Sequence, residues 1–137
     1  MLKFTILFSL SALFTLSSFF TDKNMGINPT GTYEYDHGER GNGTIKVNKI
    51  SADKIVLSIF VIGGPPSHNM GEFMETLTLS NGVATYKSEE CGLKFVFSST
   101  AVTVTQSGED CGFGNGITAN GTFKKTSSEV PDMEEFY

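Results

Sequence analysis

Two histidines and two cysteines are the residues of this chain whose types could do chemistry. His37 lies in the run Tyr-Asp-His-Gly-Glu-Arg, where a metal ligand or a general base could be imagined, and His68 stands alone in a proline-containing loop. A metal ion needs three or four converging ligands, but neighbouring side chains on a strand point to opposite faces, so Asp36 and His37 diverge. We interpret both histidines as surface side chains, and we predict no catalytic residue, no metal site and no cofactor.

The first twenty residues indicate export from the cytoplasm. Lys3 precedes a run from Phe4 to Phe20 that is apolar except for Ser and Thr, and this layout is typical of a secretory signal peptide. We expect cleavage between Ser18 and Thr21 and a mature protein that is secreted or periplasmic, with no stable membrane insertion. An uncleaved anchor is the alternative, because the run is close to the length of a membrane span.

Export determines how Cys91 and Cys111, the only cysteines, are interpreted. Oxidising compartments favour disulfides, and the pair lacks the Cys-x-x-Cys spacing of redox motifs. The neighbouring residues are acidic and would raise the pKa of a thiol, which disfavours a reactive cysteine: Glu89, Glu90, Glu109 and Asp110. We predict a structural disulfide between Cys91 and Cys111.

The glycine-rich run from Cys111 to Gly116 superficially resembles a phosphate-binding loop. Its spacing differs from Gly-x-Gly-x-x-Gly, and a strand-like run follows it instead of a helix. The glycines are better interpreted as residues that allow a tight loop beside a disulfide.

Charge narrows the choice of partner. The chain has 137 residues, and removal of residues 1–20 takes away only Lys3, which leaves a net charge of −6. An acidic protein is repelled by phosphate backbones, so we predict no nucleic-acid partner, whereas basic partners are electrostatically favoured. We divide the chain into a signal peptide (1–20), a disordered lead-in (21–30), a single barrel domain (31–126) and an acidic flexible tail (127–137).

The domain has the alternating pattern of short β-strands separated by turns. Asn81-Gly82 is the clearest hairpin signal. Eight strands are predicted, at residues 32–37, 44–50, 54–62, 72–80, 83–88, 92–98, 101–106 and 117–125. The fold class is therefore all-β, and an up-and-down antiparallel barrel of about eight strands is the simplest closure, with a β-sandwich as the alternative.

The strand at 54–62 is apolar on both faces, unlike a strand with one face in water. Its outer face should be covered by another element or by a partner. A homo-oligomer formed through strand 54–62 is one possibility.

Two loops are candidates for a binding surface. The first is stiffened by two prolines, and its candidate residues are Pro65, Pro66, His68, Asn69 and Met70. The second contains Phe113 and Asn115 beside the predicted disulfide. Phe113 could insert into a partner or could cap the barrel core, and the two loops could lie at the same mouth or at opposite mouths.

The motifs Gly31-Thr32-Tyr33 in the first strand and Gly121-Thr122-Phe123 in the last resemble those of small lipocalin-like (calycin-type) barrels. The resemblance implies an aromatic side chain across the barrel floor, with Tyr33 where lipocalins carry Trp. Size, signal and disulfide are also similar to those of exported bacterial barrels that include periplasmic lysozyme inhibitors. Their Trp-containing inhibitory motif is absent, so no inhibitory residue can be transferred.

These observations predict a secreted or periplasmic, non-catalytic protein that binds a protein or small-molecule ligand through its barrel-mouth loops. The alternatives are an inhibitor of a secreted hydrolase such as lysozyme and a carrier of a small apolar ligand inside the barrel. An enzyme that uses His37 or His68 is the weakest alternative. Asn42 and Asn120 fit the glycosylation sequon, although Asn-Gly is also what a tight turn requires.

Overall fold

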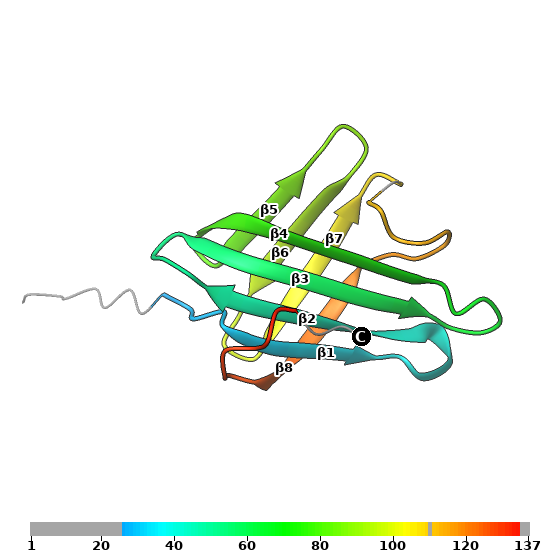
Figure 1. Ribbon diagram of the computed structural model, residues 1–137, viewed down its shortest axis with the longest axis horizontal. Coiled ribbons are helices and arrows are strands. Elements are labelled where there is room, and N and C mark those ends of the chain that lie inside the picture. Colours follow the sequence, from blue (N-terminus) through cyan, green and yellow to red (C-terminus); the bar gives the residue numbers. More distant parts are fainter. Residues whose placement is uncertain (1–25, 110, 135–137) are drawn as a thin grey trace, which may run out of the picture.

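The computed structural model describes residues 26–109 and 111–134, so the predicted signal peptide lies outside the described residues. Eight antiparallel strands form a closed up-and-down barrel in which β8 pairs with β1 (Figure 1), as the sequence predicted. Among the described residues, no helix is long and apolar enough to cross a membrane. The elements are β1 (Gly31–Asp36), the short 3-10 helix η1 (Gly38–Arg40), β2 (Gly41–Lys49), β3 (Lys54–Gly63), β4 (Met70–Ser80), β5 (Val83–Lys87), β6 (Gly92–Phe97), β7 (Ala101–Ser107) and β8 (Gly121–Ser127).

Side chains from alternate strand positions fill the barrel interior. In β3, for example, Ile55, Leu57 and Ile59 are fully buried and face inward. They belong to one hydrophobic cluster that also contains Tyr33 and Phe95. Because burial of each large apolar side chain stabilises the fold by about 1.5–3 kcal/mol, this filled interior accounts for much of the stability of the barrel.

The connections divide into two groups, at opposite ends of the barrel. One group, which we call the loop end, consists of residues 37–40, 64–69, 88–91 and 108–120. The other group, the opposite end, consists of residues 50–53, 81–82 and 98–100. Figure 1 shows that β1 to β4 run side by side across the front of the barrel, and that β5, β6 and β7 cross behind them at a steep angle.

The prediction for the last strand was wrong at its start. β8 spans Gly121–Ser127, and the residues before it form part of the loop that begins after β7. The amide of Ile117 donates a hydrogen bond to the carbonyl of Gly114 at 2.9 Å, which makes a turn where a strand was expected. The alternation of Ile117 and Ala119 with polar residues imitated a strand, because buried loop side chains can have the same spacing.

The last two residues of the predicted lead-in pack on the barrel. Pro29 is fully buried, and its carbonyl accepts a hydrogen bond from the Tyr33 hydroxyl at 2.7 Å. The Thr30 hydroxyl accepts another from the amide of Lys49 at 3.1 Å. Residues 29 and 30 therefore belong to the barrel and cover its opposite end.

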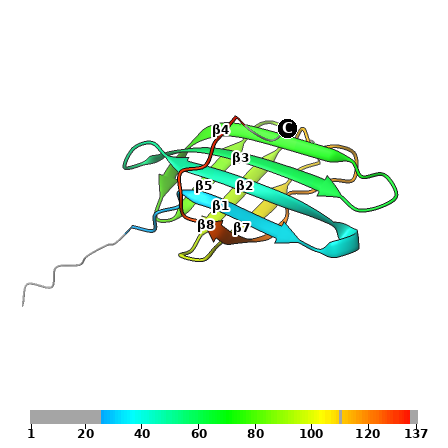
Figure 2. The same ribbon diagram turned by 60° about the horizontal axis from the view of Figure 1, so that its bottom comes forward.

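The outer face of β3 is partly covered, as its two-sided apolar pattern predicted. Ser58 points outward, yet it is only 1% exposed, and its neighbours Val56 and Phe60 on that face are half-buried. The segment after β8 runs back across the outer side of β1 and β2 in both views (Figures 1 and 2). Residues 128–134, which the sequence placed in a flexible tail, thus lie along the front sheet. Self-association through strand 54–62 stays a prediction.

Candidate functional site

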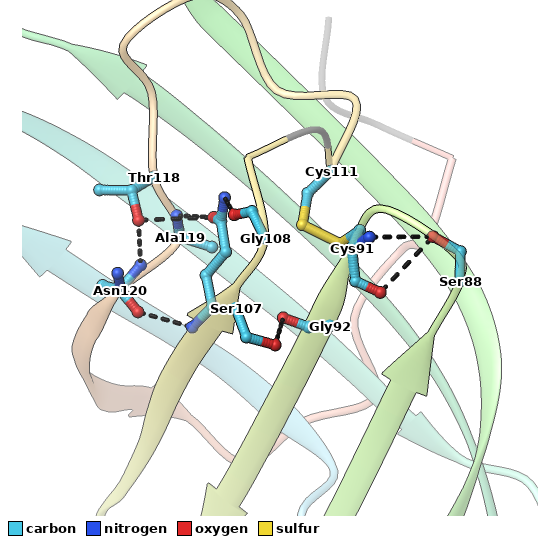
Figure 3. Close-up of a disulfide and its surroundings, with 10 residues drawn as sticks. Ser88, Cys91, Gly92, Ser107, Gly108, Cys111, Thr118, Ala119 and Asn120 are labelled. Carbon is cyan, nitrogen blue, oxygen red and sulfur yellow. Dashed lines mark hydrogen bonds between the residues drawn. A yellow bond between two sulfur atoms is a disulfide. The ribbon is translucent and has the colours of Figure 1, made fainter.

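The predicted disulfide is confirmed. Cys91 and Cys111, both buried, are bonded with their Cα atoms 4.8 Å apart, and this links the start of β6 to the loop 108–120 (Figure 3). The amide of Cys91 donates a hydrogen bond to the Ser88 hydroxyl at 3.2 Å. The bridge therefore ties the longest loop of the loop end to a hydrogen-bonded turn between β5 and β6.

Gln106, at the end of β7, holds both ends of the loop 108–120. Its side-chain oxygen accepts a hydrogen bond from the amide of Ala119 at 2.9 Å, and its side-chain nitrogen lies 3.4 Å from the carbonyl of Gly108. The backbone N–H of Gln106 donates a hydrogen bond to Oδ1 of Asn120. Asn120 lies on the part of the loop shown in Figure 3. Sequence reasoning missed Gln106, because one glutamine at a strand end carries no pattern that marks it as a clamp.

The two candidate binding loops lie side by side at the loop end. The Asn69 side chain donates a hydrogen bond to the carbonyl of Asn115 at 2.8 Å, which joins the proline loop to the disulfide loop. Phe113 lies so close to Gly71 that a Cβ atom added there would meet Phe113 atoms at 2.6–2.7 Å. The sequence left open whether these loops share a mouth, and the structure shows that they do.

The proline loop is also packed against η1. A side chain at Gly64 would overlap the backbone of Glu39, so the glycine permits this close approach. Pro65, Pro66 and His68 are exposed on the outer side of the loop. His68 has a positive φ of 47°, and the bond between the two prolines is cis.

Phe113 is half-buried and packs against the hydrophobic core. Of the two roles that the sequence left open, it has the packing expected of a cap, and its partly exposed ring remains at the surface of the loop end. Asn115 is exposed beside it, and Met70 is 62% exposed at the start of β4. The loop end therefore displays amides, prolines and one exposed methionine around a partly covered phenylalanine.

His37 lies at the same end but in a different environment from His68. Its ring stacks on Tyr35 with the ring centres 4.4 Å apart, and Tyr35 stacks on Phe123 at 5.0 Å. This row of rings leads from the barrel core to the surface. In residues 26–109 and 111–134, no three His, Cys, Asp or Glu side chains come close enough together to hold a metal ion.

The charges exposed in the described loops of the loop end are mainly negative. Arg40 is the exception, and it borders a small cavity of about 70 Å³ together with Asn42 and Asn120. A larger groove of about 410 Å³ runs along the outside of the β5–β6 hairpin. The exposed acidic residues of these loops are Glu39, Glu89, Glu90 and Glu109.

The described chain is thus an all-β barrel whose candidate binding residues lie at one end. Comparison with known protein families, with curated proteins and with solved structures found no match. The function is therefore inferred from the geometry and charge of the barrel itself.

Proposed function

We propose that this protein is an exported, non-catalytic binding protein that recognises a partner protein through its loop end. The observation that carries this conclusion is the joining of the two candidate loops by the Asn69–Asn115 hydrogen bond and the packing of Phe113 on Gly71. A surface that is assembled before binding loses little conformational entropy on association. The disulfide and the Gln106 clamp serve the same end, because they restrict the loop that carries Phe113.

The partner is expected to be basic where it meets the loop end. The acidic side chains of the described loops outnumber the single arginine there, and the mature chain has a net charge of −6. Opposite charges steer two proteins together and raise the association rate, an effect that salt weakens. The binding rate should therefore fall as ionic strength rises.

An inhibitor of a secreted hydrolase such as lysozyme is a specific form of this function. The negative loop end favours it, because lysozymes are basic. Such an inhibitor should slow a muramidase at a near-stoichiometric ratio, and changes in loop 109–116 should abolish the effect. Undiminished lysis of cell walls in the presence of excess protein would rule out this form and leave the general binding function standing.

Carriage of a small apolar ligand inside the barrel has less support. Ile59, Leu77, Phe95 and Phe97 all point into the barrel and are at least 94% buried in one cluster. A ligand in this position would have to displace side chains that already pack together, and close-packed interiors resist such changes.

The binding function can be tested by photo-crosslinking in the natural host. A photoreactive amino acid is placed at Asn115 in the loop end and, as the matched control, at Ser99 in the opposite end; both residues are exposed. We expect a crosslinked protein partner from position 115 and none from position 99. Equal crosslinking from both positions, or none from either, would contradict recognition through the loop end.

A further inference from the structure

The barrel has one seam at which neighbouring strands barely pair. β4 pairs with β3 from Met70 to Thr78, but it pairs with β5 only through Leu79 and Ser80, next to the hairpin. β5 then turns away from β4 and follows β6 along its whole length (Figure 1). Most of β4 therefore has a strand partner on one side only.

The hydrogen-bond pattern shows which backbone groups face the seam. The amide of Leu79 donates to the carbonyl of Asp53, so the odd-numbered residues of β4 direct their N–H and C=O groups toward β3. The even-numbered residues direct theirs toward β5. Among the described residues, the N–H and C=O groups of Met74 and Thr76 and the N–H group of Thr78 have no strand partner at this edge.

Side chains on the inner face of β4 along the seam are partly accessible to solvent. Glu75 is on the inward side of β4, opposite the fully buried Leu57 of β3, and yet Glu75 is exposed. Phe73 and Tyr86 are half-buried across the seam, with ring centres 4.7 Å apart. Met74, on the outer side of β4, is 55% exposed.

We propose that the free edge of β4 binds an extended segment of a cationic polypeptide, which adds to the sheet as a further strand. Unpaired strand edges are templates for such addition, with main-chain hydrogen bonds supplying affinity and alternate side chains supplying specificity. If the segment's basic side chains lie on the face of Glu75, its alternate, apolar side chains lie on the other face and contact Met74. This site lies on the side of the barrel and does not depend on the loop end.

Charge selects this occupant over a second copy of the chain. β4 contains Glu72 and Glu75 and has no Lys or Arg between Met70 and Ser80. Two β4 edges paired antiparallel would bring these acidic strands together, and like charges that face each other across strands are destabilising. A cationic segment gains from the exposed Glu75 carboxylate.

The probe is the blocked octapeptide acetyl-(Lys-Val)₄-amide, added to the full mature protein while amide exchange is followed by NMR. Without peptide, the amides of Met74, Thr76 and Thr78 should exchange rapidly. With saturating peptide, their exchange should slow at least tenfold. The corresponding Glu-Val peptide is the charge control and should have no effect.

Two pairs of variants test the two parts of recognition. Thr76→Pro removes an N–H group from the free edge without touching the β3 ladder, and it should weaken binding at least tenfold, whereas Thr76→Val should bind like the wild type. Glu75→Gln should weaken binding several-fold and lower its salt dependence, and it remains informative if Thr76→Pro does not fold.

Three results would overturn the assignment. The first is no binding of the Lys-Val peptide. The second is binding that leaves exchange of the Met74, Thr76 and Thr78 amides unchanged. The third is slow exchange of these amides in the absence of peptide, with an exchange rate that falls further as the protein concentration rises. This result would identify a second copy of the chain as the occupant. Crosslinking from Asn115 is unaffected by all three results, so the two sites are tested separately.

Discussion

The contact between Gly71 and Phe113 gives the sharpest test of how the loop end is built. Gly71→Ala adds one carbon that would lie 2.6–2.7 Å from three atoms of Phe113, where ordinary contact is 3.4–4 Å. Phe113 must then move by about 1 Å, and overpacking of this kind costs about 1–3 kcal/mol. Alanine in a strand regains about 0.5–1 kcal/mol relative to glycine. We therefore expect a net loss of about 1–2 kcal/mol in the free energy of unfolding.

Urea unfolding followed by circular dichroism measures that loss, and hydrogen exchange read by mass spectrometry shows where the change occurs. Exchange over residues 111–117 should become faster in Gly71→Ala, while exchange over β6 and β7 stays the same. Gly26→Ala is the matched control, because a Cβ atom there meets nothing within 4 Å. If Gly71→Ala has wild-type stability and unchanged exchange over residues 111–117, Phe113 does not pack on β4, and the joined loop end is refuted.

Three further changes test other parts of the barrel. Replacing Cys91 and Cys111 together by Ala should lower the free energy of unfolding by about 3 kcal/mol, since the denatured chain regains the freedom of a loop closed across 20 residues. Urea titration without reductant measures this loss of stability. A loss below about 1 kcal/mol would contradict the prediction. Burial raises the pKa of Tyr33 from 10.0 to about 12, so the stabilisation by its neutral phenol is complete below pH 10 and is lost as the pH rises toward 12. Relative to Tyr33→Phe, the wild type should lose about 2–3 kcal/mol in the free energy of unfolding over this interval. A difference between the two proteins that stays constant with pH would show that the phenol is not buried. Ser58→Ala should raise the stability by about 1 kcal/mol, because the Ser58 hydroxyl is buried without a hydrogen-bond partner among the described residues; a thermal melt that shows destabilisation would indicate that the hydroxyl is bonded.

The strands were predictable because their information is local. Alternation of apolar and polar residues, together with the continuous apolar run of β3, located seven of the eight strands closely, and Asn81-Gly82 marked the hairpin between β4 and β5. Closure into a barrel followed from the short connections. The disulfide was predictable for a different reason, because a chain with only two cysteines has one possible intramolecular pair.

The candidate site was less predictable because it depends on contacts between distant segments. Asn69 and Asn115 are 46 residues apart, and no local pattern says that one amide will bond to the other's backbone. The role of Gly71 could not be predicted for the same reason. In the sequence it is an ordinary strand residue, and only the structure shows that Phe113 packs against it. The prediction of a strand at 117–125 was wrong at its start for a related reason, since a loop that is hydrogen-bonded to Gln106 can bury alternate side chains without being a strand.

A filled interior changes where a barrel of this kind can bind. With its core occupied by aromatic and branched side chains, the barrel can offer partners only its ends, its outer faces and any unpaired edge. Here the opposite end is covered by Pro29 and Thr30, and the outer face of β3 is covered in part. Two of the surfaces left for recognition are the loop end and the β4 seam, and both display exposed carboxylates. If binding has shaped this protein, a basic partner is therefore the consistent expectation at either place.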